Sequence, residues 1–305
     1  MRQVVLQVRV LGRDGWPVLG LARENFRVSV DGKPVAVESA RWVDSGEMGS
    51  SPGENHGGRL VTILVQRDMQ RARLSGLMAY KGWAARLVES LPAHDHVALL
   101  VQDSRLYVYS DLTPDHGAVA RLLRTGLFRP PPKTPPAPGR ASVLPLLPES
   151  AQAAAATREK GLLLLARALA QLPGERVVLL LGWGLGRFSY PGFDLPGEYL
   201  EAVALLAAEQ VQVFALDITD ADFHTLELGL VQVAEDTGGL YAKTHLFPAT
   251  ATGRVLGALS GYYELAFPRP PLPEGVHRVE VELAGASGTV LCRRTFADPP
   301  SVGLP

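Results

Sequence analysis

Four aspartates could form an acid–base set: Asp68, Asp217, Asp220 and Asp222. They stand at the ends of two short apolar segments that the sequence predicts to be strands. If both strands are parallel, their carboxyl ends meet at one edge of a sheet, where paired carboxylates could serve a hydrolase. Aspartates at strand ends also commonly cap the helices that follow. Hydrolysis is therefore one hypothesis, and helix capping is its structural alternative.

Other chemical motifs are weak or incomplete. His94 and His96 flank Asp95 at a spacing that suits metal chelation, but the segment precedes an apolar strand and is interpreted as an exposed turn. The seven histidines form no HExxH-like pair, and no G-x-S-x-G elbow between a predicted strand and a predicted helix appears. Residues 182–186 read G-x-G-x-G, yet neither a third glycine nor a helix follows at dinucleotide-site spacing. Cys292 lies on an alternating apolar segment, where a buried, unreactive thiol is expected.

One loop, residues 182–199, gathers residue types that dominate protein-binding surfaces. It contains Trp183, Arg187, Phe188, Tyr190 and Phe193. Aromatic and arginine side chains bury a large area, lose few rotamers and keep a polar group, so they predominate in binding hot spots. The structural alternative is that two or three of the aromatics fold back onto the domain. We interpret the loop as a candidate protein-binding surface.

The composition is that of an ordinary globular protein. The chain has 305 residues, 47% hydrophobic and 20% charged, and a domain commonly has about 150 residues. Thirty basic and 31 acidic residues give a formal charge of -1, so no general attraction to nucleic acid is expected. One cysteine excludes an internal disulfide, and no apolar run approaches the roughly 20 residues that span a bilayer. As numbered, the chain starts without an export signal, which predicts a cytoplasmic protein, or an envelope or secreted one if a leader was removed.

The periodicity of apolar residues predicts an α/β domain. Short apolar strands alternate with amphipathic stretches, which is typical of a mostly parallel sheet covered by helices on both faces. The predicted strands are 60–66, 97–102, 105–110, 176–182, 211–217 and 240–243, and the predicted helices are 74–91, 115–127, 149–172, 197–210, 222–236 and 249–259. Only Asp103 and Ser104 separate the second and third strands, so this pair must be an antiparallel hairpin near a sheet edge.

Both ends of the chain show the two-residue alternation of half-buried antiparallel strands. The N-terminal segment includes a hairpin with the turn Asp31-Gly32, and the C-terminal segment contains three strands. Neither segment can bury a core alone, so we predict that they form one small β-sandwich into which the α/β domain is inserted. The predicted boundaries are 1–43 and 261–297 for the sandwich, 44–59 for a linker, 60–260 for the α/β domain with a Pro-rich insertion at 128–148, and 298–305 for a tail.

The order of elements and several motifs resemble the von Willebrand factor A-type domain. Residues 95–99 (DHVAL) are similar to its D-x-V-A-L motif, residues 211–217 to its V-x-V-x-A-x-D strand, and residues 237–241 (TGGLY) to its T-G-G-x-Y signature. Residues 8–28 resemble the leading segment of acidobacterial von Willebrand A-related proteins. The resemblance covers nearly the whole chain. It implies a doubly wound, Rossmann-like sheet whose first and fourth strands lie side by side, with a ligand crevice at their carboxyl ends.

The family builds a metal-ion-dependent adhesion site in that crevice. Its ligands are a D-x-S-x-S motif after the first strand, a threonine from a long loop and an aspartate after the fourth strand. The corresponding positions here are Gln66, Arg67, Asp68, Met69 and Gln70, then Gly182-Trp183-Gly184, with Thr134 or Ser142 as the candidate hydroxyls. Mg²⁺ prefers about six hard oxygens, and one carboxylate with two amides satisfies it poorly. We therefore predict a degenerate site that holds no metal.

These features predict a non-enzymatic protein-interaction or scaffolding module without a cofactor. The residues expected to contact a protein partner are Asp68, Gln70, Trp183, Arg187, Phe188, Tyr190 and Phe193. One alternative is Mg²⁺-dependent, adhesion-type ligand binding through a residual site at Asp68. Another is a hydrolase that uses the strand-end aspartates. A third is a purely structural subunit whose crevice is filled by its own side chains.

Overall fold

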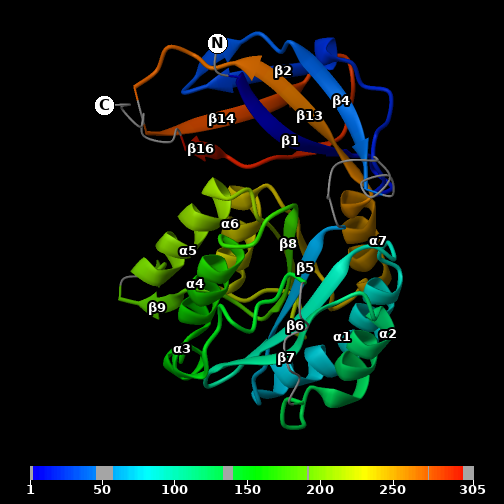
Figure 1. Cartoon of the computed structure of the whole chain (residues 1–305), viewed down its shortest axis with the longest axis vertical. Helices are drawn as coiled ribbons and strands as arrows, with labels where there is room; N and C mark the ends of the chain where they lie inside the picture. Colours follow the sequence, from blue (N-terminus) through cyan, green and yellow to red (C-terminus); the bar gives the residue numbers. More distant parts are fainter. Residues whose placement is uncertain (1–2, 46–57, 133–139, 191, 274, 298–305) are drawn as a thin grey trace.

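The computed structural model describes residues 3–45, 58–132, 140–190, 192–273 and 275–297. A β-sandwich contains the strands from both ends of the chain, and an α/β domain lies beneath it (Figure 1). Most of the predicted linker (46–57), part of the Pro-rich insertion with Thr134 (133–139) and the predicted tail (298–305) lie outside the described residues. The domain boundaries stay a prediction.

Six strands form the central sheet of the α/β domain, in the order β12-β11-β8-β5-β6-β7. They are β5 (Leu60–Gln66), β6 (His96–Gln102), β7 (Leu106–Thr113), β8 (Arg176–Gly182), β11 (Gln212–Asp217) and β12 (Tyr241–Lys243). β5 pairs in parallel with both β6 and β8, while β7 at the edge is antiparallel to β6. The prediction of a doubly wound sheet with the first and fourth strands side by side is confirmed.

Helices cover both faces of this sheet (Figure 1). One face packs against α1 (Arg71–Glu89), α2 (His116–Arg121) and α7 (Pro248–Leu259), and the other against α4 (Arg158–Leu169), α5 (Gly197–Ala208) and α6 (Glu227–Thr237). β5 is buried along its whole length, because alternate side chains enter the two opposite layers. No helix in the described ranges is long and apolar enough to cross a membrane.

Two of the predicted helices are interrupted. The predicted helix 149–172 is two helices, α3 (Glu149–Ala154) and α4. The break occurs because Thr157 caps α4, with its side-chain oxygen accepting a backbone N–H at 3.2 Å. The predicted helix 115–127 begins as α2 and continues as a π-helical turn, Leu122–Gly126. The break before α4 brings the start of that helix to the carboxyl edge of the sheet.

The two ends of the chain form a sandwich of two four-stranded sheets, ordered β15-β1-β13-β4 and β16-β14-β2-β3. Their bounds are β1 (Gln3–Leu11), β2 (Phe26–Val30), β3 (Lys33–Val35), β4 (Ser39–Asp44), β13 (Gly261–Pro268), β14 (Val276–Leu283), β15 (Thr289–Leu291) and β16 (Thr295–Ala297). Each sheet combines strands from both ends, and Val8, Phe26 and Tyr263 share one core. The predicted β-sandwich is confirmed.

The last predicted strand is divided between the two sheets. β15 pairs with β1, whereas β16 pairs with β14, so the alternation over residues 290–296 covers two strands and the segment that joins them. Cys292 lies in this joining segment and is half-buried. Burial raises the pKa of its thiol to about 11. The thiolate form is therefore disfavoured at neutral pH, as expected for an unreactive cysteine.

Two buried ion pairs lie where the sandwich meets the α/β domain. Arg59 Nη2 lies 2.7 Å from Asp95 Oδ2, and both side chains are fully buried. Arg9, on β1, has its Nη2 3.2 Å from Glu175 Oε1, and burial lowers the pKa of its guanidinium to about 10. The interpretation of residues 94–96 as an exposed turn is wrong for Asp95, because the guanidinium of Arg59 covers its carboxylate.

Candidate functional site

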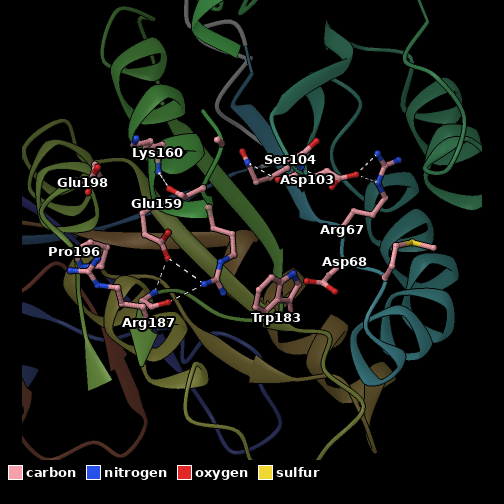
Figure 2. Close-up of a pocket in the computed structure, with 16 residues that line it drawn as sticks. Arg67, Asp68, Asp103, Ser104, Glu159, Lys160, Trp183, Arg187, Pro196 and Glu198 are labelled. Atoms are coloured by element: carbon pink, nitrogen blue, oxygen red, sulfur yellow. Dashed lines mark hydrogen bonds and ion pairs between the residues drawn. The ribbon is translucent and has the colours of Figure 1, made fainter. Parts of the chain in front are cut away.

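The carboxyl ends of β5, β6 and β8 border a pocket with a volume of ≈ 660 Å³. Its walls are the segments that follow these strands and the start of α4. Figure 2 shows Trp183 near the centre, Asp68 on one side of it, and Glu159 and Arg187 on the other. This is the crevice that the strand order predicts, because connections leave β5 and β8 toward opposite faces of the sheet.

Gln66 closes the floor of the crevice. Its side chain is 1% exposed, and its Oε1 accepts hydrogen bonds from the backbone N–H groups of Trp183 and Gly184 at 2.9 and 3.2 Å. Since Gln66 ends β5 and Gly182 ends β8, this amide oxygen holds the two central strands together just past their paired residues. An oxygen that already accepts two N–H groups has little capacity left for a cation.

Both carboxylate oxygens of Asp68 are also engaged. Oδ1 accepts from the backbone N–H of Gln70 at 2.6 Å, and Oδ2 accepts from Arg73 Nη1 at 2.8 Å. The side chain of Arg67 points to Asp103 instead, with Nη2 2.7 Å from its Oδ2. A cation at Asp68 would therefore have to displace the guanidinium of Arg73.

The indole of Trp183 packs against two guanidinium groups. The Cζ atoms of Arg73 and Arg158 lie 3.4 and 3.9 Å from its ring, inside the range of about 6 Å for cation–π attraction. Arg158 is fixed in turn, because it donates to Gly184 O and Gly186 O at 3.0 and 2.9 Å, and burial lowers its pKa. Trp183 is 9% exposed, and its Nε1 has no hydrogen-bond partner among the described residues.

A short hairpin, β9 (Arg187–Ser189) and β10 (Gly192–Asp194), forms the outer rim. It begins after Gly186, whose φ of +85° favours glycine and whose N–H donates to Glu159 Oε1 at 2.8 Å. Arg187 Nε pairs with the carboxylate at the end of β10 at 3.0 Å. The hairpin is thus anchored at its base by a buried glutamate.

The aromatics of this loop divide into two groups. Trp183 is buried, and Phe193 is half-buried with its ring packed against Gly186. In contrast, Phe188 is 68% exposed and Tyr190 is fully exposed. The alternative that some aromatics fold back therefore describes two of them, and the other two remain on the surface beside the pocket.

The structure brings together some of the predicted site residues but not all. Asp68, Trp183 and Arg187 line the pocket, whereas Gln70 is exposed at the N-terminus of α1. Of the candidate hydroxyls, Ser142 donates to Asp111 on β7 at 2.6 Å. The hydroxyl residues that line the pocket are Ser104, after β6, and Thr157, the cap of α4.

The sequence interpretation missed Arg73, Arg158 and Glu159. A visible signal existed for the two arginines, because both stand in the first turn of a helix, where the helix dipole disfavours positive charge. Basic residues at such positions indicate a specific contact that outweighs the dipole. Here that contact is the indole of Trp183.

The strand-end aspartates do not share this pocket. Asp68 alone of the four lines it, whereas Asp217 Oδ2 lies 2.9 Å from His224 Nε2, and Asp220 Oδ1 lies 2.6 Å from His245 Nδ1. Burial of Asp217 opposes its ionisation, but hydrogen bonds from His224 and a backbone N–H hold its pKa below the usual value. The convergent acid–base set that a hydrolase would need is not formed in this pocket.

No protein-family model matches the chain, and no curated protein matches it. Among solved structures, the chain is similar to BatB from Bacteroides thetaiotaomicron, with 17% identity over 66% of this chain and 99% of that chain, and a TM-score of 0.39. The chain is also similar to proximal thread matrix protein 1 from the mussel byssus, with a zinc-occupied MIDAS motif. The identity is 13% over 75% of this chain and 50% of that chain, and the TM-score is 0.45. A third similar structure contains three N-terminal domains of the type V pili tip protein Mfa5 from Porphyromonas gingivalis. The identity is 10% over 92% of this chain and 69% of that chain, and the TM-score is 0.44.

The strand order, the antiparallel edge strand and the crevice give the α/β domain a von Willebrand factor A-type fold. This conclusion rests on the topology of the chain itself. A relation to the acidobacterial von Willebrand A-related proteins stays a prediction.

Proposed function

We propose that the protein is a non-enzymatic, metal-independent protein-binding module. Its contact surface is the crevice together with the β9–β10 hairpin. The observation that supports this most is the pair of hydrogen bonds from Trp183 and Gly184 to Gln66 Oε1, which uses the oxygen at the first ligand position of the family's metal site. The guanidinium of Arg73 supplies the positive charge beside Asp68 that a metal ion would otherwise supply.

The surface combines a rigid floor with an exposed apolar rim. Trp183 lines the pocket and packs against the guanidinium groups of Arg73 and Arg158, so this part of the floor loses little entropy when a partner binds. Basic and acidic side chains line the pocket in equal number, which gives no general preference for an anion or a cation. Phe188 and Tyr190 offer apolar area next to it, the composition typical of a binding hot spot.

Metal-dependent binding through Asp68 is the second candidate, and it gives the opposite result in a titration. We expect millimolar Mg²⁺ to leave the melting temperature unchanged, because Arg73 occupies Asp68 Oδ2 and a ligand that binds only the folded state must raise the melting temperature. Differential scanning fluorimetry with and without EDTA measures this. A rise of several degrees that Asp68→Ala abolishes would establish the metal-dependent alternative.

Loss of the exposed aromatic side chains of the rim should strongly reduce capture of the protein partner. The tagged full chain is immobilised, exposed to a lysate of the organism that makes it, and bound proteins are identified by mass spectrometry. We expect the double variant Phe188→Ala/Tyr190→Ala to reduce capture roughly tenfold or more, since hot-spot aromatics each contribute more than about 1–2 kcal/mol. EDTA should have no effect on capture by the unchanged chain.

The matched control for this experiment is Trp16→Ala. Trp16 is 54% exposed but belongs to the sandwich segment next to β1, away from the pocket. We expect Trp16→Ala to capture the same proteins as the unchanged chain. If Trp16→Ala and the double variant lose the same proteins, or if EDTA alone releases them, the proposed surface is wrong.

A further inference from the structure

A second cluster of metal-ligating side chains lies at the carboxyl end of β11. Asp217 ends that strand, Glu227 begins α6, and His224 lies in the loop between them. One ligand atom from each residue lies within 4.8 Å of the other two. Asp217 is 2% exposed, and the side chains of His224 and Glu227 are 19% and 11% exposed. Few water molecules can reach the space that the three share.

An ion bound here would replace the hydrogen bond between His224 and Asp217 and would draw together ligand atoms that now lie within 4.8 Å of one another. His224 Nε2 lies 2.9 Å from Asp217 Oδ2, and tetrahedral ligands of a zinc ion with bonds of about 2.1 Å stand roughly 3.4 Å apart. The carboxylate of Asp217 is already oriented, because its Oδ1 accepts from the Thr219 N–H at 2.9 Å and its Oδ2 from the Tyr241 hydroxyl at 3.0 Å. Hydrogen bonds of this kind commonly hold metal ligands in place.

The charges around the cluster also favour a cation. Asp220 and Asp222 belong to the same loop, and both approach His245, at 2.6 and 3.9 Å. With Asp217 and Glu227, this loop and the elements beside it carry four carboxylates. Lys243 Nζ lies 2.8 Å from Glu227 Oε2 and also donates to Asp222 O. Lys243 is therefore the internal competitor that an ion must displace from Glu227.

We propose that Asp217, His224 and Glu227 bind a divalent transition-metal ion. One imidazole nitrogen and two carboxylate oxygens match Zn²⁺ best among common ions, whereas Mg²⁺ prefers oxygen alone. Three protein ligands leave a fourth position for water or an external group. The site is separate from the crevice, so protein binding there does not depend on it, and either proposal can fail alone.

Calorimetric titration of the chelator-treated full chain tests the site, with Zn²⁺ and Mg²⁺ as the two probes. We expect one Zn²⁺ to bind and Mg²⁺ to bind far more weakly. His224→Gln should weaken Zn²⁺ binding at least about tenfold, because the amide can still donate to Asp217 but is a poor ligand. His94→Gln is the matched control, since His94 lies at the opposite end of the sheet beside Ser45, and it should bind Zn²⁺ as the unchanged chain does.

Lys243→Met separates a metal site from a purely structural ion-pair network. Removing the competing ammonium should tighten Zn²⁺ binding several-fold, although it removes an ion pair with Glu227. Co²⁺ should give visible absorption bands of a four-coordinate ion, and these should be lost in His224→Gln. The proposal fails if the unchanged chain binds no Zn²⁺, if His224→Gln binds it equally well, or if Lys243→Met leaves the affinity unchanged or weaker.

Discussion

Replacing Asp95 with alanine is expected to lower the free energy of unfolding by about 3–5 kcal/mol. The side chains of Asp95 and Arg59 are both fully buried, and the carboxylate accepts from Arg59 Nε and Nη2 at 3.3 and 2.7 Å. Without the carboxylate, a charged guanidinium stays buried with neutral hydrogen-bond partners, such as the Ser45 hydroxyl at 3.2 Å. Urea denaturation followed by circular dichroism measures the change as a lower midpoint at constant slope.

The control is an ion pair of similar distance on the surface. Arg167 Nη2 lies 2.5 Å from Glu201 Oε1, but both side chains are 56% exposed. Glu201→Ala should lower the free energy of unfolding by less than about 1 kcal/mol. Equal losses for the two variants would show that burial does not determine the effect. A further check is Arg59→Met/Asp95→Leu, which should recover part of the loss because neither position then leaves a buried charge without its partner.

Gly76→Ala should destabilise the protein by about 3 kcal/mol or more, at the upper end of the range for overpacked sites. Gly76 lies in α1, and a Cβ at this position would overlap the carbonyl oxygen of Ile218, just after β11. Because the atom that this Cβ would meet belongs to the backbone, α1 and the end of β11 would have to move apart. That movement would also disturb the hydrogen bonds from Asp220 N to Ala72 O and from Ser75 Oγ to Asp220. Thermal and urea unfolding both measure the loss.

The same helix provides a matched control with the opposite sign. A Cβ at Gly82 would have no atom within 4 Å. Gly82→Ala should therefore stabilise the protein by about 0.5–1 kcal/mol, the gain expected for alanine over glycine in a helix. If both alanine variants are more stable than the unchanged chain, the close approach of α1 to the loop after β11 is not as tight as described.

The sequence predicted the fold well where burial alone sets the pattern. β5 and β8 are fully or almost fully buried, so their apolar runs end where the strands end. The division of residues 290–296 could not be predicted, since alternation marks strand character but not which sheet a strand joins. Asp95 was misjudged for a related reason. Its burial depends on Arg59, which lies 36 positions earlier in the chain.

Prediction of the candidate site was limited in the same way. Gln66 and Trp183 were recognised as departures from a metal-binding pattern, but a side-chain amide bound to backbone N–H groups has no sequence signature. The cluster at Asp217, His224 and Glu227 combines a strand end with residues seven and ten positions further on. No common metal-binding motif has that spacing, so only the folded loop shows that their ligand atoms meet.

The pairing of β4 with β13 has a mechanical consequence. The chain leaves the sandwich after Asp44 and returns at Gly261, and these two residues are register partners in one antiparallel ladder. Because β1 and β4 both pair with β13, tension applied along the polypeptide from the β1 and β16 sides would cross between sandwich strands and bypass the inserted domain. A stretched protein would therefore have to separate these strands before any load reached the crevice, so the sandwich would shield the proposed contact surface from tension.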